Sequence, residues 1–481
     1  MPTQTKKITI DAAALFFGKV IGLVLGIVRL NYLATFLGLA SFGILNFALY
    51  FCSLFQVLFD FGISQLLTRN LARDLQRSSE YVGKAMVLKV IIVFIASSVV
   101  GLIAMILKFD PISNWAILLT TIAFAINGLS MVLLSAFQAH RKMVIVSISN
   151  IFNDLLLSGL IILIITKYPL LMTALILSVI VNFFNLLILY IVYVHKIGIP
   201  RFKIDVALWQ DFIRESAPIA VSSFGISMYT FIGITILKYT RGDIEVGIYT
   251  AGYKLISVLT LIPITFSQVI FPIFSDFYKN ATSKLAKALQ DSLRVMAQIS
   301  MPLAVGIMIL APKIISLLFP AAFGDAKSVL QIIIIGDAFA YFAWILYAFL
   351  LAIDRQRICM KLSLFIALIS FIVNMIIVPS WGYIGVAISV LISDILLFLS
   401  YSYHSIKIGF SFGDIKSFIK IMIASAILGI TLSIFREWYL IPTIACAIIV
   451  YVISLSLMQA FGDQEKEFFK KYIGWMQYVR Y

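Results

Sequence analysis

The chain has 481 residues, of which 62% are hydrophobic and 12% are charged, and its formal net charge is +15. A soluble domain averages about 45–50% apolar and about 25% charged residues, so this composition excludes a soluble globular protein and indicates an integral membrane protein. The apolar runs are far longer than the ~10 alternating residues of a barrel strand, which leaves membrane-spanning helices.

Fourteen apolar runs of about 20–27 residues follow one another, and each is long enough to cross a ~30 Å hydrocarbon core. We therefore expect an all-α integral membrane protein with about 14 transmembrane helices. The centres of these spans fall near residues 23, 51, 94, 125, 154, 180, 227, 260, 304, 340, 368, 391, 425 and 448.

The loops between these spans alternate in charge. One set carries clusters of Lys and Arg, and the other is short and poor in both residues, as near Gly38, Pro111 and Gly242. By the positive-inside rule, we expect the basic loops and both termini on the cytoplasmic side. Because this alternation accounts for most of the net charge, the partner that we expect for it is anionic membrane lipid and no nucleic acid.

A short stretch occurs twice, each time between two apolar spans. Gly38-Leu-Ala-Ser-Phe-Gly43-Ile returns about 204 residues later as Gly242-Asp-Ile-Glu-Val-Gly247-Ile. The spacing of the two glycines and the place in the hydropathy pattern are the same in both copies. This recurrence predicts an internal duplication, which in membrane transporters usually places the binding site between the two halves.

The duplication predicts the domain organisation. Residues 1–195 would hold spans 1–6, residues 215–406 spans 7–12, and residues 196–214 a cytoplasmic linker helix. Residues 407–481 would add spans 13 and 14 and a cytoplasmic tail. Because six spans is an even number, both copies have the same orientation, which predicts two pseudo-symmetric six-helix bundles around a central cavity.

Charged residues inside spans are costly and usually face a cavity or a partner. In span 1, four residues share one helical stripe with Tyr32 at its edge; they are Lys19, Gly22, Gly26 and Arg29. One interpretation is substrate binding by Arg29 and Lys19. The other is a glycine packing face with Lys19 paired to Asp60, although spans 1 and 2 have no acid at the depth of Arg29.

A second intramembrane cation, Lys254, lies in span 8 on a polar stripe with Ser257, about as far from the outer loop as Arg29. Two cations at similar depth, one in each half, suit a multiply charged anionic headgroup such as pyrophosphate. The alternative is pairing with intramembrane Asp residues. Asn182 in span 6 would contact sugar hydroxyls or neighbouring helices.

Four carboxyl groups inside spans are candidates for carrying a coupling ion, H⁺ or Na⁺. They are Asp60, Asp154, Asp337 and Asp394. The three cysteines are far apart and the three histidines show no ligand spacing, so we expect no metal site and no cofactor.

Local motifs make the chain resemble the polysaccharide (O-antigen repeat-unit) flippases of the MATE-like (MOP) exporter superfamily. The motifs are Leu37-Gly38 with Phe42-Gly43 after span 1, Asp60-Phe61-Gly62 closing span 2 and followed by Arg69, and Gly247-Ile248-Tyr249 with Lys254 opening span 8. The resemblance extends over essentially the whole chain through hydropathy and length.

The resemblance implies a bacterial inner-membrane flippase, not an enzyme. Such proteins move an undecaprenyl-pyrophosphate-linked oligosaccharide of the O-antigen of lipopolysaccharide, or of a related surface polysaccharide, from the cytoplasmic to the periplasmic leaflet. They do so by alternating access coupled to a cation gradient. The resemblance implies that Arg29 and Lys254 line the cavity and that polysaccharide polymerase or ligase machinery is a further partner. The internal duplication predicts a functional monomer.

Three alternatives stay open. The peptidoglycan lipid-precursor flippases have Asp directly after an Arg in span 1, whereas Leu30 follows Arg29 here. MATE-type drug/cation antiporters usually have 12 spans and an acidic or aromatic cavity. A membrane glycosyltransferase or O-antigen ligase would need a sizeable outer loop or a catalytic acid cluster, and the outer loops here are short.

Overall fold

The computed structural model describes residues 2–280, 282–410, 415–435 and 437–460, with side chains except those of residues 2–20, 73, 218, 219, 222, 279, 282 and 283. These ranges are helical nearly throughout and hold no strand, so the predicted all-α fold is confirmed. Residues 461–481 of the predicted tail and the side chain of Lys19 lie outside the described part.

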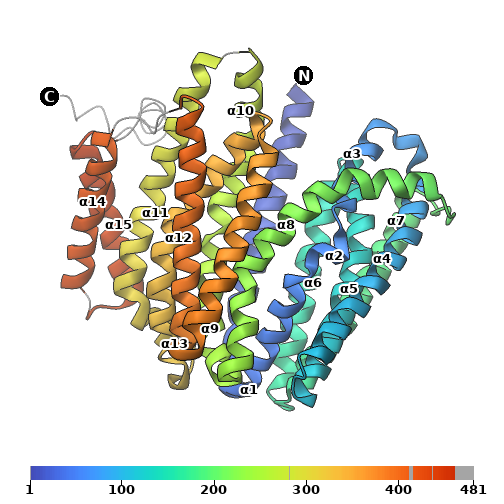
Figure 1. The fold of residues 1–481 in the computed structure, drawn as a ribbon, viewed down its shortest axis with the longest axis horizontal. Coiled ribbons are helices and arrows are strands. Elements are labelled where there is room, and N and C mark those ends of the chain that lie inside the picture. Colours follow the sequence, from blue (N-terminus) through green and yellow to red (C-terminus); the bar gives the residue numbers. More distant parts are fainter. Residues whose placement is uncertain (1, 281, 411–414, 436, 461–481) are drawn as a thin grey trace. The chain divides into compact units, whose positions relative to one another are not determined.

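The helices follow one another along the chain with short connections (Figure 1). In order they are α1 (Pro2–Leu54), α2 (Gln56–Asp60), α3 (Ile63–Arg73), η1 (Leu75–Arg77), α4 (Ser78–Ile106), α5 (Pro111–Ala139), α6 (Met143–Ile165), α7 (Leu171–Lys196), α8 (Val206–Arg241), α9 (Asp243–Leu259), α10 (Leu261–Asn280), α11 (Thr282–Leu318), η2 (Ala321–Phe323), α12 (Ala326–Ala352), α13 (Gln356–Lys407), α14 (Ile415–Ile434) and α15 (Leu440–Leu457).

Among the described residues, 11 segments are long and apolar enough to cross a membrane. Two of them, in α1 and α13, each join two predicted spans across a glycine with non-helical backbone angles, Gly38 and Gly382. The seventh predicted span lies in α8, which is not among the eleven. Dividing α1 and α13 and adding α8 accounts for the 14 predicted spans, and the chain is a multi-pass membrane protein.

Capping residues explain where two of these helices begin. Asp110 precedes α5 and accepts a hydrogen bond from the backbone N–H of Ser113 at 3.0 Å, with Pro111 at the first helical position. Asp205 accepts from the backbone N–H of Leu208 at 3.0 Å and starts α8. Of the predicted linker helix at 196–214, residues 197–205 are therefore not helical, and the remainder forms the first turns of α8.

The chain forms two compact units. The first comprises Met1–Ala251, Leu318–Gly324 and Ser363–Val386, and the second comprises Gly252–Leu317, Asp325–Leu362 and Ala387–Tyr481. In the first unit, α5 packs against α4 and α7, and α1 packs against α6. A buried cluster that includes Leu67, Phe137 and Phe212 forms one of its cores. The predicted lobe boundaries stay a prediction.

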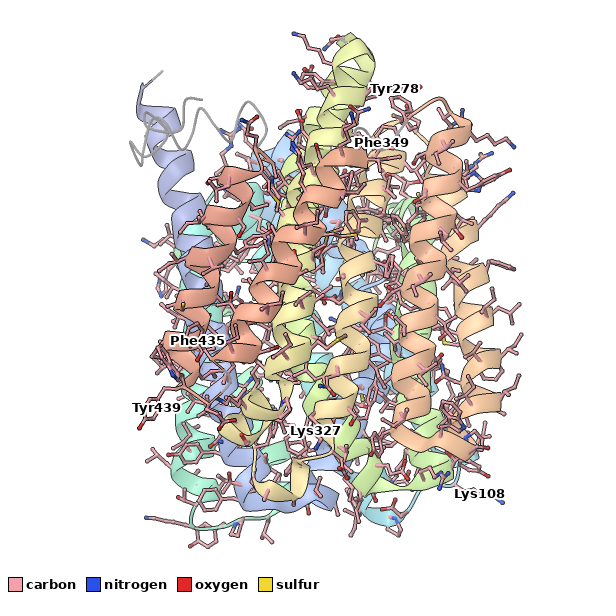
Figure 2. The ribbon with its side chains drawn as sticks, turned by 90° about the vertical axis from the view of Figure 1, so that its left-hand side faces the viewer. Lys108, Tyr278, Lys327, Phe349, Phe435 and Tyr439 are labelled. Atoms are coloured by element: carbon pink, nitrogen blue, oxygen red, sulfur yellow. The ribbon has the colours of Figure 1, made fainter. Side chains whose placement is uncertain are left out.

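In the second unit, α10 packs against α12, and α14 packs against α15. The rings of Phe274 on α10 and Phe349 on α12 have their centroids 5.8 Å apart. Figure 2 shows Tyr278 and Phe349 toward one end of this unit, and Lys327 and Tyr439 toward the other. Residues next to basic loops and residues next to short loops thus lie at opposite ends, as expected for helices that alternate in direction.

The two copies of the repeated stretch share an unusual backbone. Gly38 has φ 72° and ψ 174°, and Gly242 has φ 85° and ψ −170°. This region of backbone space is essentially restricted to glycine. The first glycine of each copy therefore makes the turn between two spans.

The second glycines of the two copies pack against each other. A Cβ added to Gly43 would overlap the carbonyl oxygen of Asp243, and one added to Gly247 would lie 2.6 Å from the carbonyl oxygen of Leu39. Leu39 precedes Gly43 by four residues, and Asp243 precedes Gly247 by four, so the contact is reciprocal. Two copies of one motif related by a local two-fold axis make such a contact.

Candidate functional site

Arg29 on α1 faces the polar side of α6. Its Nη1 lies 3.9 Å from Oδ1 of Asp154 and 3.4 Å from Oγ of Ser158. Both distances are long for charge-assisted hydrogen bonds. The Arg29 side chain is 24% exposed. The guanidinium therefore has an acid beside it but keeps donors that a better acceptor can take.

Small residues on α1 bring the Asp154 carboxylate close to this helix. A Cβ added to Gly22 would lie 2.6 Å from Oδ2 of Asp154, so a larger residue would displace the carboxylate. A Cβ added to Gly26 would meet no atom within 4 Å. The glycine stripe is thus a packing face at Gly22 and borders open space at Gly26. The acid beside Arg29, which spans 1 and 2 do not provide, comes from α6 as Asp154.

Among the described side chains, the cation beside Asp60 is Lys89 of α4; the side chain of Lys19, the partner in the alternative interpretation, lies outside the described residues. Nζ of Lys89 lies 2.7 Å from Oδ1 of Asp60, and the Lys89 side chain is 0% exposed. Lys89 also donates to the Asp60 carbonyl at 3.2 Å, and Ser64 donates to the carboxylate. Asp60 ends α2 directly before the left-handed residues Phe61 and Gly62, so the buried lysine fixes a break in span 2.

Asp337 and Asp394 form a buried carboxyl pair in the second unit. Asp337 on α12 is 3% exposed and accepts a hydrogen bond from Oγ1 of Thr260 at 2.9 Å. Within the described residues its Oδ2 has no hydrogen-bond partner. Asp394 on α13 is 7% exposed, interacts electrostatically with Asp337, and has its Oδ2 3.0 Å from where a Cβ of Gly336 would be. Neither carboxyl makes an ion pair with a described Lys or Arg.

The carboxyl pair lies beside a break in span 8. Helix α9 ends at Leu259 and α10 begins at Leu261, with Thr260 between them. In span 2, the corresponding break separates α1 from α2 at Phe55, within one residue of the equivalent position. The N–H of Thr260 still donates to the carbonyl of Ile256 at 3.0 Å, and the carbonyl of Leu259 accepts from the hydroxyl of Tyr341 at 2.9 Å, so the break in span 8 is a kink that leaves neither backbone group unpaired.

The other predicted site residues are partly buried and make local contacts. Ser257 donates to the carbonyl of Lys254 in the same helix at 2.7 Å. Asn182 donates to the carbonyl of Ser178 at 2.7 Å, and the Tyr32 ring stacks on Phe36 with centroids 6.0 Å apart. Lys254 lies in the second unit and Arg29 in the first. A cavity shared by these two cations stays a prediction.

Lys238 is a second cation missing from the predicted set. It lies near the end of α8, where its Nζ is 2.8 Å from Oδ1 of Asp110 and 2.5 Å from Oδ1 of Asp243. Burial alone would raise the pKa of Asp110, but the hydrogen bonds from Lys238 and Ser113 lower it to about 2. Lys89 and Lys238 are both single lysines in apolar runs, the same signal that identified Lys19 and Lys254.

The described residues hold no group of three or more His, Cys, Asp or Glu side chains that would bind a metal ion. They do hold Arg29 with spare donors, Lys238 between two acids, and the carboxyl pair of Asp337 and Asp394. An arginine with spare donors is suited to binding an anion, and a buried carboxyl pair is suited to exchanging a cation or a proton.

Two family models match the chain. The model described as polysaccharide biosynthesis protein matches residues 8–278, and the model described as MatE matches residues 218–377.

The chain is 23% identical over 200 residues to the capsular polysaccharide biosynthesis protein CapF of Staphylococcus aureus, covering 41% of this chain and 50% of that protein. It is 22% identical over 200 residues to the probable low-salt glycan biosynthesis flippase Agl15 of Haloferax volcanii, covering 40% and 42%. It is 25% identical over 237 residues to the probable lipid II flippase MurJ of Rickettsia prowazekii, covering 46% of each chain. The chain thus spans about half the length of the curated relatives it matches.

Solved structures share the fold over most of the chain. The lipid II flippase MurJ in an inward closed conformation matches with a TM-score of 0.77 and 16% identity, over 97% of this chain and 100% of that one. An inward-facing multidrug resistance MATE family transporter matches with a TM-score of 0.68 and 15% identity, over 80% and 94%. These matches confirm the MATE-like fold predicted from the sequence.

Proposed function

Because the chain belongs to the polysaccharide biosynthesis protein family, whose model covers more than half of it, we propose that it is a flippase of the bacterial inner membrane for a lipid-linked oligosaccharide. The substrate is an undecaprenyl-pyrophosphate-linked repeat unit of an O-antigen or related surface polysaccharide. It moves from the cytoplasmic to the periplasmic leaflet by alternating access. Relatives named for capsular polysaccharide biosynthesis and for glycan or lipid II flipping support this proposal.

The observation that carries the proposal is the loosely paired Arg29. The carboxylate of Asp154 is 3.9 Å from its guanidinium, so the ion pair is weaker than one with ideal contact. A pyrophosphate carries more negative charge than one carboxylate and can accept several guanidinium hydrogen bonds at once. We therefore assign Arg29, together with Lys254 from the other half, to the pyrophosphate. Binding would exchange Asp154 for the substrate as the main partner of Arg29.

For the coupling ion, the charges of the described residues favour Asp337 and Asp394 over the other two acids. Asp60 is paired with Lys89, and Asp154 lies beside Arg29. Two carboxyl groups buried together without a cation are costly when both are ionised. Our proposal is that this pair takes up a proton in one half of the transport cycle and releases it in the other.

Complementation tests the substrate assignment. A strain that lacks the flippase but carries the cognate repeat-unit pathway would receive the wild type, Arg29→Ala, Arg29→Lys or Lys254→Ala at equal membrane abundance. We expect the wild type to restore surface polysaccharide, both alanine variants to fail, and Arg29→Lys to restore it partly, because lysine keeps the charge but not the forked donors. Full activity of both alanine variants would refute the assignment of the two cations.

Proteoliposomes test the coupling. With an imposed pH gradient we expect substrate accumulation by the wild type and none by Asp337→Asn or Asp394→Asn. If a Na⁺ gradient drives transport and a pH gradient does not, the proton assignment is wrong.

A drug/cation antiporter is the second candidate, because the MatE model matches residues 218–377 and the Asp337–Asp394 pair would suit an organic cation. Export of a cationic dye by a strain in which no surface polysaccharide is restored would favour this candidate. Restoration of peptidoglycan precursor flipping instead would favour the lipid II type of activity named for one relative.

A further inference from the structure

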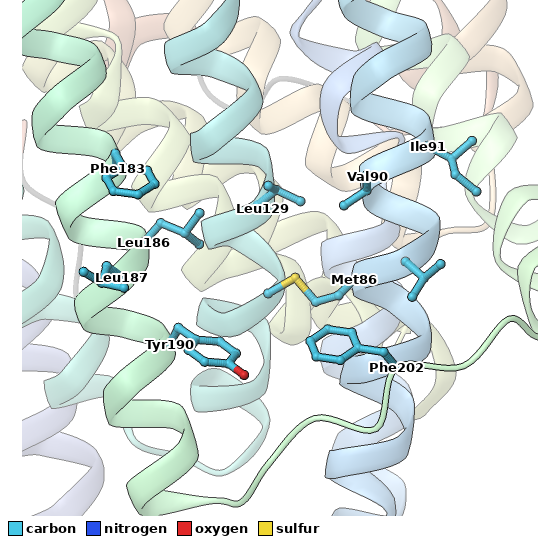
Figure 3. Close-up of a pocket in the computed structure, with 10 residues that line it drawn as sticks. Met86, Val90, Ile91, Leu129, Phe183, Leu186, Leu187, Tyr190 and Phe202 are labelled. Atoms are coloured by element: carbon cyan, nitrogen blue, oxygen red, sulfur yellow. The ribbon is translucent and has the colours of Figure 1, made fainter.

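An apolar groove runs along the first unit where α4 and α5 meet. One of its two cavities, here called the lower cavity, lies beside the linker and has a volume of about 550 Å³. Figure 3 shows that it is lined by Met86 and Val90 of α4, Phe183 and Tyr190 of α7, and Phe202 of the linker. A second cavity of about 600 Å³ continues along the same two helices and is lined by Gly101, Met105, Trp115 and Ile122, among others. Leu129 lines both cavities, so they adjoin.

The groove faces outward from the unit and has the length of the hydrocarbon core. Val90, Met105, Trp115 and Phe183 are more than half exposed although they are large and apolar. From Met86 to Met105, α4 rises about 28 Å at 1.5 Å per residue, close to the ~30 Å thickness of a bilayer core. An occupant of the groove would therefore come from the membrane.

Small residues leave room in the groove. A Cβ added to Gly101 would meet no atom within 4 Å, and Ala104 and Ala125 also line the upper cavity. The space therefore results from the choice of side chains on α4 and α5 and not from a helix break, since both helices are continuous there.

Two cations stand at the lower end of the groove. Arg201 and Lys203 flank the lining residue Phe202, and both are exposed and make no ion pair with a described residue. The linker that carries them is fixed to the start of α4, because the backbone N–H of Arg201 donates to the carbonyl of Ser79 at 2.8 Å. A Cβ on Gly83 would overlap the Arg201 backbone, so only glycine allows this close approach.

We propose that this groove binds the polyprenyl chain of the lipid-linked substrate before transport, with its pyrophosphate held first by Arg201 and Lys203 and then passed to Arg29 and Lys254. The proposal rests on the proposed function for the identity of the substrate. A phospholipid chain reaches only about half of the ~30 Å core and would fill one cavity. A polyprenyl chain long enough to pass both leaflets would fill both cavities from a single headgroup. The groove would thereby hold the lipid-linked substrate on the outside of the protein until its headgroup leaves Arg201 and Lys203 for the proposed cavity.

Fluorescence quenching tests the proposal with purified protein in vesicles of brominated phosphatidylcholine. Trp115 lines the cavity far from the two cations, and the difference between the wild type and Trp115→Phe isolates its signal. We expect undecaprenyl pyrophosphate to displace the brominated chains and restore Trp115 fluorescence. Farnesyl pyrophosphate has the same headgroup and a shorter chain. When its pyrophosphate binds Arg201 and Lys203, its chain would not reach Trp115.

Three variants sharpen the test. Gly101→Phe should fill the upper cavity and weaken the effect of undecaprenyl pyrophosphate by about tenfold or more, which corresponds to about 1.4 kcal/mol. Gly159→Phe on α6 is the matched control, because a Cβ there also meets no atom within 4 Å. It should behave as the wild type. The double variant Arg201→Ala/Lys203→Ala should lose the effect with both cavities intact.

Equal recovery by the two pyrophosphates would overturn the proposal, since the groove would then hold ordinary lipid without regard to chain length. The same conclusion would follow if the Gly101→Phe and Gly159→Phe variants behaved alike, or if the double variant kept the full effect. The result is independent of the complementation test. If the protein binds the long chain but restores no polysaccharide, the proposed function is refuted and the proposal of a polyprenyl groove stands. If it restores polysaccharide but does not bind the long chain in the groove, only the proposal of the groove is refuted.

Discussion

The buried pair between Lys89 and Asp60 gives a quantitative prediction. Lys89 is 0% exposed and Asp60 is 28% exposed, with a distance of 2.7 Å between Nζ and Oδ1. Asp60→Ala would leave an uncompensated charge in the core, which costs about 3–5 kcal/mol for buried pairs. Lys89→Met should cost less, about 1–3 kcal/mol, because Asp60 keeps some contact with solvent and the hydrogen bond from Ser64. The double variant should be more stable than Asp60→Ala alone, because it buries no charge.

The measurement is the loss of folded protein on heating in detergent for the wild type, both single variants and the double variant. Lys84→Ala is the control, since Lys84 pairs with the more exposed Glu80 and Asp205 and should cost at most about 1 kcal/mol. We expect a strongly non-additive cycle, with Asp60→Ala the least stable member. If the two single losses simply add, or if Lys89→Met is the worse variant, the account of a buried charge stabilised by its partner is wrong.

Two further predictions concern the contacts near the short loops. Gly43→Ala should lower stability by about 1–3 kcal/mol, because the new Cβ would overlap the Asp243 carbonyl, whereas Gly159→Ala should be neutral or slightly stabilising; equal thermal stability of the two variants would contradict this. The pKa of Asp110 is about 2, below its ordinary value of 3.8, so its contribution is present above about pH 4 and is lost as the pH falls toward 2. Because the Asp110 side chain is 43% exposed, Asp110→Asn should cost only about 1 kcal/mol at pH 7 and progressively less below pH 4. A cost that stays constant between pH 7 and pH 3 in thermal melts would show that Lys238 does not stabilise the charged form of Asp110.

The sequence determined the fold class, the number of spans and the family resemblance, because each depends on local properties of the chain. Lipid forces the backbone into helices, so runs of apolar residues suffice to predict spans and their number. The turn glycines Gly38 and Gly242 were recognisable from their spacing because no other residue adopts their backbone angles readily. The matched family model confirms the resemblance that rested on these motifs.

Only the tertiary structure decided which charges meet. Hydropathy gives the depth of a residue in the membrane but not the direction in which it points around its helix. The pairing of Asp60 with Lys89, 29 residues away, and of Arg29 with Asp154, 125 residues away, therefore depends on how α1, α2, α4 and α6 pack. The same holds for the meeting of Asp337 with Asp394 and for the groove along α4 and α5. A sequence pattern identifies residues that are costly to bury, and helix packing decides which neighbour offsets that cost.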